Sequence, residues 1–118
     1  MDLDIKRCNA LKHWAEETLL PSYVINAFSP DPKTTADADI IVTSTTSNRP
    51  VFQGANIKSG VHLNAIGAFT PNMQEIDEET VLRADKIVVD AVEETWNCSG
   101  DMELFRRPGR SPSKRPDI

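Results

Sequence analysis

Three short apolar runs in the middle of this chain limit what it can fold into. They occupy residues 39–43, 61–67 and 86–90, and each ends in small or polar side chains. Buried strands of a parallel sheet have this pattern, because ligands sit at the carboxyl ends of such strands. The runs recur roughly every 22 to 24 residues, which leaves room for the crossover connection that parallel strands require. The sequence therefore predicts an α/β fold built on a parallel sheet.

Helical patterns flank these runs. Residues 5–20 carry apolar side chains at helical spacing, and Pro21 stops that helix. Asp77 is a good N-cap for a helix that reaches about Ala84. Residues 92–98 also have a helical pattern, which Ser99 and Gly100 end.

The remaining segments are mostly loops. Residues 23–26 are compatible with a short strand, and residues 33–38 with a helical turn before the first apolar run. Residues 43–60 are rich in Ser, Thr, Asn, Pro and Gly, which predicts loop with one turn of helix near Asn56.

The spacing of the glycines does not match the glycine-rich loop that usually follows the first strand of a nucleotide-binding sheet. The chain has five glycines and no GxG pair, so it contains no glycine-rich loop of the kind that holds pyrophosphate. The chain therefore looks like part of a dinucleotide-binding fold that lacks its phosphate loop.

Charge divides the chain into an acidic body and a basic tail. Residues 106–118 hold five Lys or Arg and one Asp, a net of +4, which leaves −9 on the rest of a chain whose total is −5. An acidic body argues against nucleic-acid binding. The Pro-rich composition of residues 103–118 predicts a disordered, solvated tail rather than an arm for nucleic acid or membrane.

Other partners and settings are limited by what the sequence contains. No apolar stretch approaches the ~20 residues of a membrane helix, so no membrane association is expected. Cys8 and Cys98 lie far apart with no CxxC or Cys/His cluster, which suggests neither a metal site nor a disulfide framework. A reducing, cytoplasmic setting is the expectation.

A few side chains have both a chemical and a structural interpretation. Glu75 and Asp77 are spaced as a catalytic pair, but a helix cap at Asp77 and a solvated or loop-binding Glu75 are favoured. His62 is a candidate general base, although a place on a sheet face is favoured. Trp14 and Trp96 are expected to pack in the core or at a subunit surface.

Several blocks of this sequence together resemble the ornithine cyclodeaminase/mu-crystallin family. In chain order they are ADIIVTSTTS at 38–47, PVF at 50–52, GVHLNAIGA at 60–68, QEID at 74–77, RAD at 83–85, VVD at 88–90 and SGD at 99–101. The resemblance covers about residues 1–102 and implies that they form a partial Rossmann-type parallel sheet with flanking helices, lacking the first strand and the glycine loop. It implies a Rossmann-type NAD(P) domain that is joined, in the intact family, to a separate substrate and dimerisation domain. It also implies hydride transfer between nicotinamide and a carbon bearing an amine or imine.

The resemblance assigns cofactor contacts by position. They would come from Asp2, Asp4, Arg7, Thr43, Ser44, Thr45, Thr46, Ala65, Ile66 and Gly67. The acids at the start would hold the adenine ribose hydroxyls of NAD, whereas Arg7 stands where NADP-users place a basic residue. Both cofactors stay open, and binding by this chain alone is expected to be weak or absent. No catalytic residue is assigned.

One position departs from the cyclodeaminase pattern. Those enzymes carry an acid just after the NAxG block, and this chain has Phe69 there, which has no proton to exchange. The sequence therefore looks nearer to imine reductases and alanine dehydrogenases. We expect a cofactor-domain fragment of such an enzyme that is inactive alone and forms a homo-oligomer through exposed edges. The alternative is a non-enzymatic dimerising or binding module derived from that fold.

Overall fold

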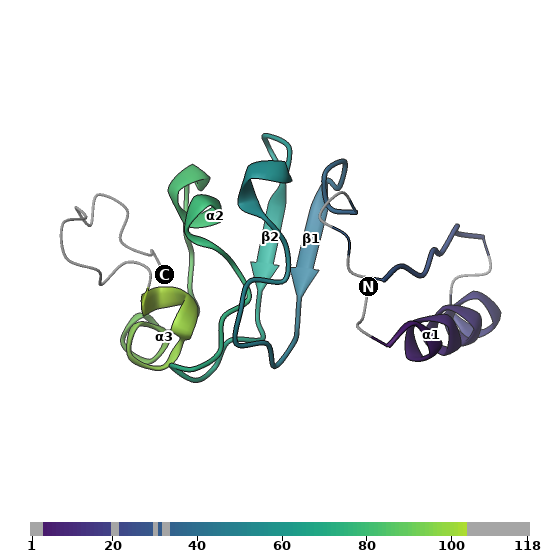
Figure 1. The fold of residues 1–118 in the computed structure, drawn as a ribbon, viewed down its shortest axis with the longest axis horizontal. Helices are drawn as coiled ribbons and strands as arrows, with labels where there is room; N and C mark the ends of the chain where they lie inside the picture. Colours follow the sequence, from purple (N-terminus) through teal and green to yellow (C-terminus); the bar gives the residue numbers. More distant parts are fainter. Residues whose placement is uncertain (1–3, 20–21, 30, 32–33, 104–118) are drawn as a thin grey trace.

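A pair of parallel strands forms the centre of the computed structural model, which describes residues 4–19, 22–29, 31 and 34–103. The elements are α1 (Ile5–Thr18), β1 (Ile40–Thr43), the 3-10 turn η1 (Gly54–Asn56), β2 (His62–Ala65), α2 (Glu78–Arg83), α3 (Val92–Cys98) and the 3-10 turn η2 (Gly100–Met102). Figure 1 shows α2 and α3 on the β2 side of the pair, with α1 beyond β1. None of the helices in the described part of the chain has the length and apolar character needed to cross a membrane.

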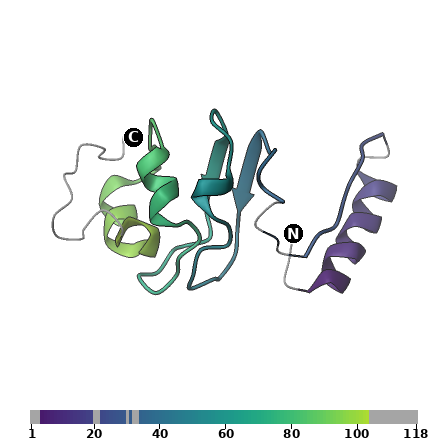
Figure 2. The same cartoon turned by 45° about the horizontal axis from the view of Figure 1, so that its top comes forward.

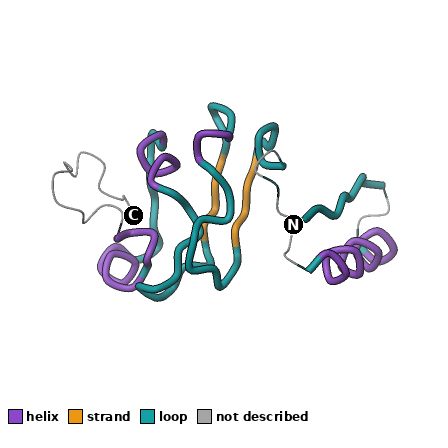
Figure 3. Tube along the Cα trace, in the orientation of Figure 1, coloured by secondary structure: helices purple, strands orange, loops and turns teal. Residues whose placement is uncertain are grey.

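The two strands run parallel, as the apolar runs predict. Their register pairs Ile40 with His62 and Thr43 with Ala65. Backbone hydrogen bonds flank the ladder at both ends, from His62 N to the Asp39 carbonyl (2.9 Å) and from Ile66 N to the Thr43 carbonyl (3.0 Å). Figure 3 shows that the connection between the strands is loop apart from η1, so this crossover is not made by an α-helix.

One face of this sheet packs against the core. Ile41 and Thr43 are buried while Ile40 and Val42 are exposed, which is the alternation expected when a strand is covered on one face. The buried apolar cluster consists of Ile41, Phe52, Ile57, Ile76 and Val81. The core therefore lies between the covered face and the segments that carry η1 and α2.

Asp77 links α2 to η1. Its carboxylate accepts hydrogen bonds from Thr80 N (2.9 Å), from Thr80 Oγ1 (2.6 Å) and from Gly54 N (2.9 Å). Burial raises the pKa of Asp77, but these hydrogen bonds outweigh it, so the pKa lies below its ordinary value. The Arg83 guanidinium also donates to the Gly54 carbonyl, which fixes the other end of α2 to the same turn. The predicted N-cap is confirmed.

α1 is a capped helix that contributes nothing to the core. The Asp4 side chain accepts from Lys6 N at its start, and Lys12 forms an ion pair with Glu16 at 2.6 Å. No residue of α1 is buried, and Leu11 is 63% exposed. Figure 2, turned from the view of Figure 1, again shows α1 apart from the strands. The predicted helix forms, but none of its apolar side chains is buried within the described residues.

Two predicted strands are not strands in the described structure. Residues 86–90 alternate between exposed and half-buried side chains as an extended segment should, yet Val88 holds only an isolated β-bridge position. Residues 23–26 are irregular, and Val24 is 89% exposed. The apolar pattern was correct at 86–90, but a strand also needs a backbone partner along its whole length.

The other predicted elements are found close to their expected bounds. The turn before β1, the helical turn ending at Asn56 and α3 with its end at Ser99 are all present. Pro21 and residues 104–118 of the predicted tail lie outside the described residues.

Substitutions at two adjacent residues of β1 test whether one face of the sheet is buried and the other exposed. Ile41→Ala removes a buried side chain and is expected to lower the free energy of unfolding by about 2–5 kcal/mol. Val42→Ala changes the exposed neighbour on the other face and should cost no more than about 0.5 kcal/mol. Urea unfolding of both variants measures this, and equal losses would show that the assignment of the faces is wrong.

Asp77 should give the stability of this domain a specific pH dependence. Asn at position 77 keeps one accepting oxygen but loses the other, so Asp77→Asn should cost about 1 kcal/mol at pH 7. Because the folded-state pKa of Asp77 is lowered, its stabilisation is present above about pH 4 and is lost as the pH falls through the lowered value. The difference from the unaltered chain should therefore shrink between pH 7 and pH 3.

The control for this measurement is Glu79→Gln. Glu79 is exposed in the first turn of the same helix, so this variant removes the same charge without removing a cap. If the difference in the free energy of unfolding between Asp77→Asn and the unaltered chain stays constant across the pH range, the role given to the Asp77 carboxylate is contradicted.

Candidate functional site

The carboxyl ends of β1 and β2 bring the two predicted cofactor segments together. β1 ends at Thr43 and β2 at Ala65, and these two residues are paired in the register. The loops that follow leave from the same edge of the sheet, at the bottom of the view in Figure 1. In parallel sheets this edge is where ligands bind, so it is the candidate site.

Glu75 connects the two loops at this edge. Its side chain is fully buried, with 0% exposure. Oε1 accepts from Thr45 N at 2.5 Å, and Oε2 accepts from Thr43 Oγ1 at 2.8 Å and from Gly67 N at 2.7 Å. One carboxylate therefore joins the loop after β1 to the loop after β2, beyond the point where strand pairing ends.

The backbone of Glu75 is also fixed. Asp101 Oδ1 accepts from Glu75 N at 2.8 Å and from Ile76 N at 3.2 Å, and the Glu75 carbonyl accepts from Val51 N at 2.9 Å. Asp101 is 3% exposed. Burial raises the pKa of Asp101 and the Glu75 carboxylate adds to this, while the two backbone donors act in the opposite direction. Asp101, which lies in η2, thus fixes the backbone of the segment that carries Glu75.

Gly67 must be glycine for this arrangement to exist. A Cβ at that position would lie 2.5 Å from both Cδ and Oε1 of Glu75 and would also collide with the Thr45 carbonyl. Such distances are far inside van der Waals contact, so either the loop or the carboxylate would have to move. The absence of a side chain lets Gly67 N approach the buried carboxylate.

The residues that face solvent at this edge have small side chains, hydroxyl groups or apolar surface. Ser44, Thr45 and Thr46 are exposed and offer hydroxyl groups, and Ala65 and Ile66 offer small and apolar surface. Neither 43–46 nor 65–67 contains Lys or Arg. This edge therefore offers hydroxyl groups and small apolar surface, without a basic side chain, to a ligand.

The N-terminal cofactor candidates lie elsewhere. Asp4 caps α1 and Arg7 is exposed in its first turn, on a helix that stands apart from the strands, while Asp2 lies outside the described residues. The structure does not bring Asp4 or Arg7 to the carboxyl edge of the sheet. Their role at the adenine ribose stays a prediction.

The candidate general base His62 does not reach this edge. His62 begins β2 and so lies at the opposite end of the strand, where it is exposed and not enclosed in a sheet face. Cys8 and Cys98 are both free thiols. Among the described residues there is no cluster of His, Cys, Asp or Glu that would hold a metal ion.

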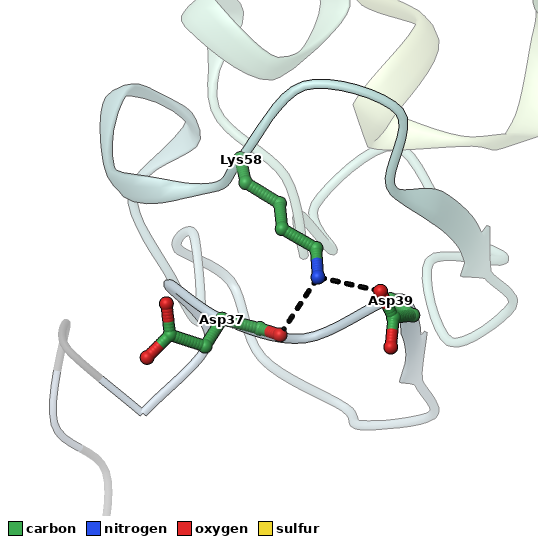
Figure 4. A network of polar contacts seen from close by, with 3 residues as sticks. All are labelled: Asp37, Asp39 and Lys58. Carbon is green, nitrogen blue, oxygen red and sulfur yellow. Dashed lines mark hydrogen bonds and ion pairs between the residues drawn. The ribbon is translucent and has the colours of Figure 1, made fainter.

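The opposite edge of the sheet has its own polar contact. Lys58 Nζ donates to the Asp37 carbonyl (3.0 Å) and forms an ion pair with Asp39 Oδ1 (2.5 Å), as Figure 4 shows. The hydrogen bond from Lys58 and its charge lower the pKa of Asp39. This contact joins the segments that enter β1 and β2, so it supports the register and is remote from the candidate site.

Sequence reasoning found both loops and did not find what joins them. Glu75 was expected to be solvated or loop-binding. It does bind loops, but the expectation of solvation is wrong. Its partners are 8 to 32 residues away in sequence, so no local pattern marks it. Flanking Gln74 and Asp77 also make the segment look like a polar loop.

Comparison with known proteins shows which family the chain resembles in sequence and structure. A Δ1-pyrroline-2-carboxylate reductase of Bacillus cereus is 42% identical over 74 residues, covering 63% of this chain and 22% of the relative. The structure of the Thermococcus litoralis Δ1-pyrroline-2-carboxylate reductase in complex with NADH and L-proline matches 89% of this chain and 32% of that one. Its TM-score is 0.79 and its identity is 29%.

A second solved structure extends the comparison. It is an archaeal alanine dehydrogenase dimer with bound NAD. The match covers 78% of this chain and 27% of the dehydrogenase chain, with a TM-score of 0.62 and 33% sequence identity. The chain thus spans only 22% to 32% of the length of these three relatives. The sequence also fits the model of the ornithine cyclodeaminase/mu-crystallin family over residues 2–114, past the expected start of the tail. The chain belongs to the ornithine cyclodeaminase/mu-crystallin family.

Proposed function

We propose that this chain forms the nicotinamide-facing part of the NAD(P) domain of an oxidoreductase that acts on an imine or amino acid. The observation that carries the proposal is the meeting of two exposed loops, 43–46 and 65–67, at the carboxyl edge of a parallel sheet. Relatives matched over this part of the chain bind NADH and NAD. Ligands of open parallel sheets bind at this edge.

In this proposal the residues of the chain bind and orient, and the cofactor supplies the redox chemistry. A bound nicotinamide cofactor would supply hydride to the carbon of an imine, which also takes up a proton, or would accept hydride from an amino acid, which also releases a proton. The hydroxyl groups of Ser44 and Thr46 would hold polar groups of the cofactor. The small surface at Ala65 lets a flat ring lie close to the strand ends, and orientation of this kind lowers the barrier to hydride transfer.

The choice of reaction within the family rests on Phe69. Its side chain is 64% exposed and follows the loop that Gly67 begins. The resemblance implies that cyclodeaminases carry an acid at this position for proton transfer, and a phenyl ring cannot exchange a proton. Reduction of a cyclic imine or dehydrogenation of an amino acid is therefore favoured over ornithine cyclodeamination.

The affinity of the chain alone should be low. Its sequence has no glycine-rich loop, so it does not supply the backbone amides that hold a pyrophosphate. Charge-assisted contacts of this type contribute roughly 1.5–3 kcal/mol each, and several are missing. We expect weak binding and no turnover of pyrroline-2-carboxylate or alanine by these residues alone.

An NMR titration tests the proposed site. NADH added to the isotope-labelled chain should shift the amides of residues 43–46 and 65–67 with weak affinity, and should leave those around Lys58 unchanged. A parallel titration with NADPH decides between the two cofactors. Shifts confined to the Lys58 edge, an absence of shifts at the two loops, or submicromolar affinity would contradict the proposal.

The uncovered apolar surface favours a second candidate function, a dimerising module. Ile40 and Val42 on the open face of β1 are more than half exposed, as are Leu11 and Leu19 of the α1 segment. Parallel sheets are normally covered on both faces, so such surface attracts a partner. One of the matched relatives is a dimer.

Sedimentation of the chain tests this second candidate. A module that dimerises through these surfaces should sediment as a defined dimer, and Val42→Asp should shift it toward monomer because a charge on the open face opposes burial. Ser59→Asp, at an exposed loop position, serves as the control. A clean monomer at high concentration would exclude self-association as the function of these surfaces.

A further inference from the structure

Beyond the last backbone hydrogen bond of the sheet, the hydrogen bonds that join the two cofactor loops in the described residues run through Glu75. The strand ladder stops with Ile66 N bonded to the Thr43 carbonyl. Past that point, Thr45 N and Gly67 N both donate to the Glu75 carboxylate. The relative position of the two loops therefore depends on a side chain that neither loop contains.

We propose that Glu75 is a positioning residue that sets the spacing of the loops 43–46 and 65–67, and thereby the surface that receives the nicotinamide end of the dinucleotide. This inference rests on the proposed function, because it names the residue that shapes the same site. Glu75 is fully buried and does not touch the ligand surface itself. It acts through Thr45 and Gly67.

The geometry requires two accepting oxygens. Oε1 serves Thr45 N, and Oε2 serves both Gly67 N and Thr43 Oγ1. A carboxylate accepts at both oxygens, whereas the amide of Gln accepts at one end and donates at the other. Gln has nearly the same shape, so Glu75→Gln removes one accepting position and leaves the volume of the core unchanged.

The same bonds determine what the loops present to solvent. The amides of Thr45 and Gly67 turn inward to the buried carboxylate, while the side chains at Ser44, Thr46 and Ile66 stay exposed. Loss of one inward bond would free its loop to rotate and would change which groups face the ligand. A buried carboxylate with three donors is costly to disturb, because each unpaired group would remain desolvated.

Amide hydrogen exchange and NADH titration of the 118-residue chain together test the inference. In Glu75→Gln, at least one of the amides of Thr45 and Gly67 should lose protection by about 10- to 100-fold, the effect of losing a hydrogen bond to a charged group. The amide of His62, which donates to the Asp39 carbonyl at the other end of the sheet, should keep its protection. NADH-induced shifts at the two loops should require about tenfold more ligand.

Matched variants separate positioning from general loss of stability. Glu79→Gln removes a charge from an exposed position a few residues away and should alter neither amide exchange nor NADH response. Gly67→Ala should reproduce the effect of Glu75→Gln, because its Cβ would displace the carboxylate. If Glu75→Gln does not fold, Thr43→Val removes a single donor and should weaken NADH binding without unfolding the sheet.

Each outcome has a distinct meaning. If Glu75→Gln loses protection at Thr45 or Gly67 and NADH binding weakens in step, the inference stands. If protection is lost while NADH binds as before, or if neither changes, Glu75 does not position the site and the proposed function survives. If the unaltered chain shows no NADH response at either loop, the proposed function fails, and the inference fails with it.

Discussion

A single buried carboxylate joins the two loops at the carboxyl edge of the sheet. Strand pairing alone would bring β1 and β2 together only as far as Thr43 and Ala65, and loops that leave a sheet are free to diverge. Glu75 extends the connection past the strands, as far as Thr45 and Gly67, because its carboxylate accepts a hydrogen bond from the amide of each. Asp101 in turn holds the backbone of Glu75. The candidate site thus depends on residues that are separated in sequence and lie beneath its exposed surface.

This arrangement explains why a small sheet can carry a defined site. Two strands of four residues give little intrinsic rigidity, and one of their faces is open to solvent. The order is supplied by polar contacts at both ends of the strands, with Lys58 between the segments that enter them and Glu75 between the loops that leave them. The apolar cluster around Ile41 fills the covered face between these two sets of contacts.

Local patterns in the sequence predicted the elements that local chemistry decides. The cap at Asp77, the end of α3 at Ser99 and the strands around Ile41 and Leu63 follow from side chains within a few residues of one another. The strand expected at 86–90 has the predicted alternation of burial but lacks a continuous partner, and pairing is a tertiary property. Both loops of the site were predicted, while the contact that joins them spans 30 residues and leaves no local trace.

Family membership gives this geometry a chemical context. Relatives matched over most of the chain bind nicotinamide dinucleotides, and the loops that Glu75 connects lie at the edge where a parallel sheet receives such a ligand. The central claim is that Glu75 ties these loops together, and an experimental structure of the chain at high resolution tests it most directly. The account predicts Thr45 N and Gly67 N both within about 3 Å of the Glu75 carboxylate. A Glu75 side chain turned out to solvent, with the two loops apart, would contradict it.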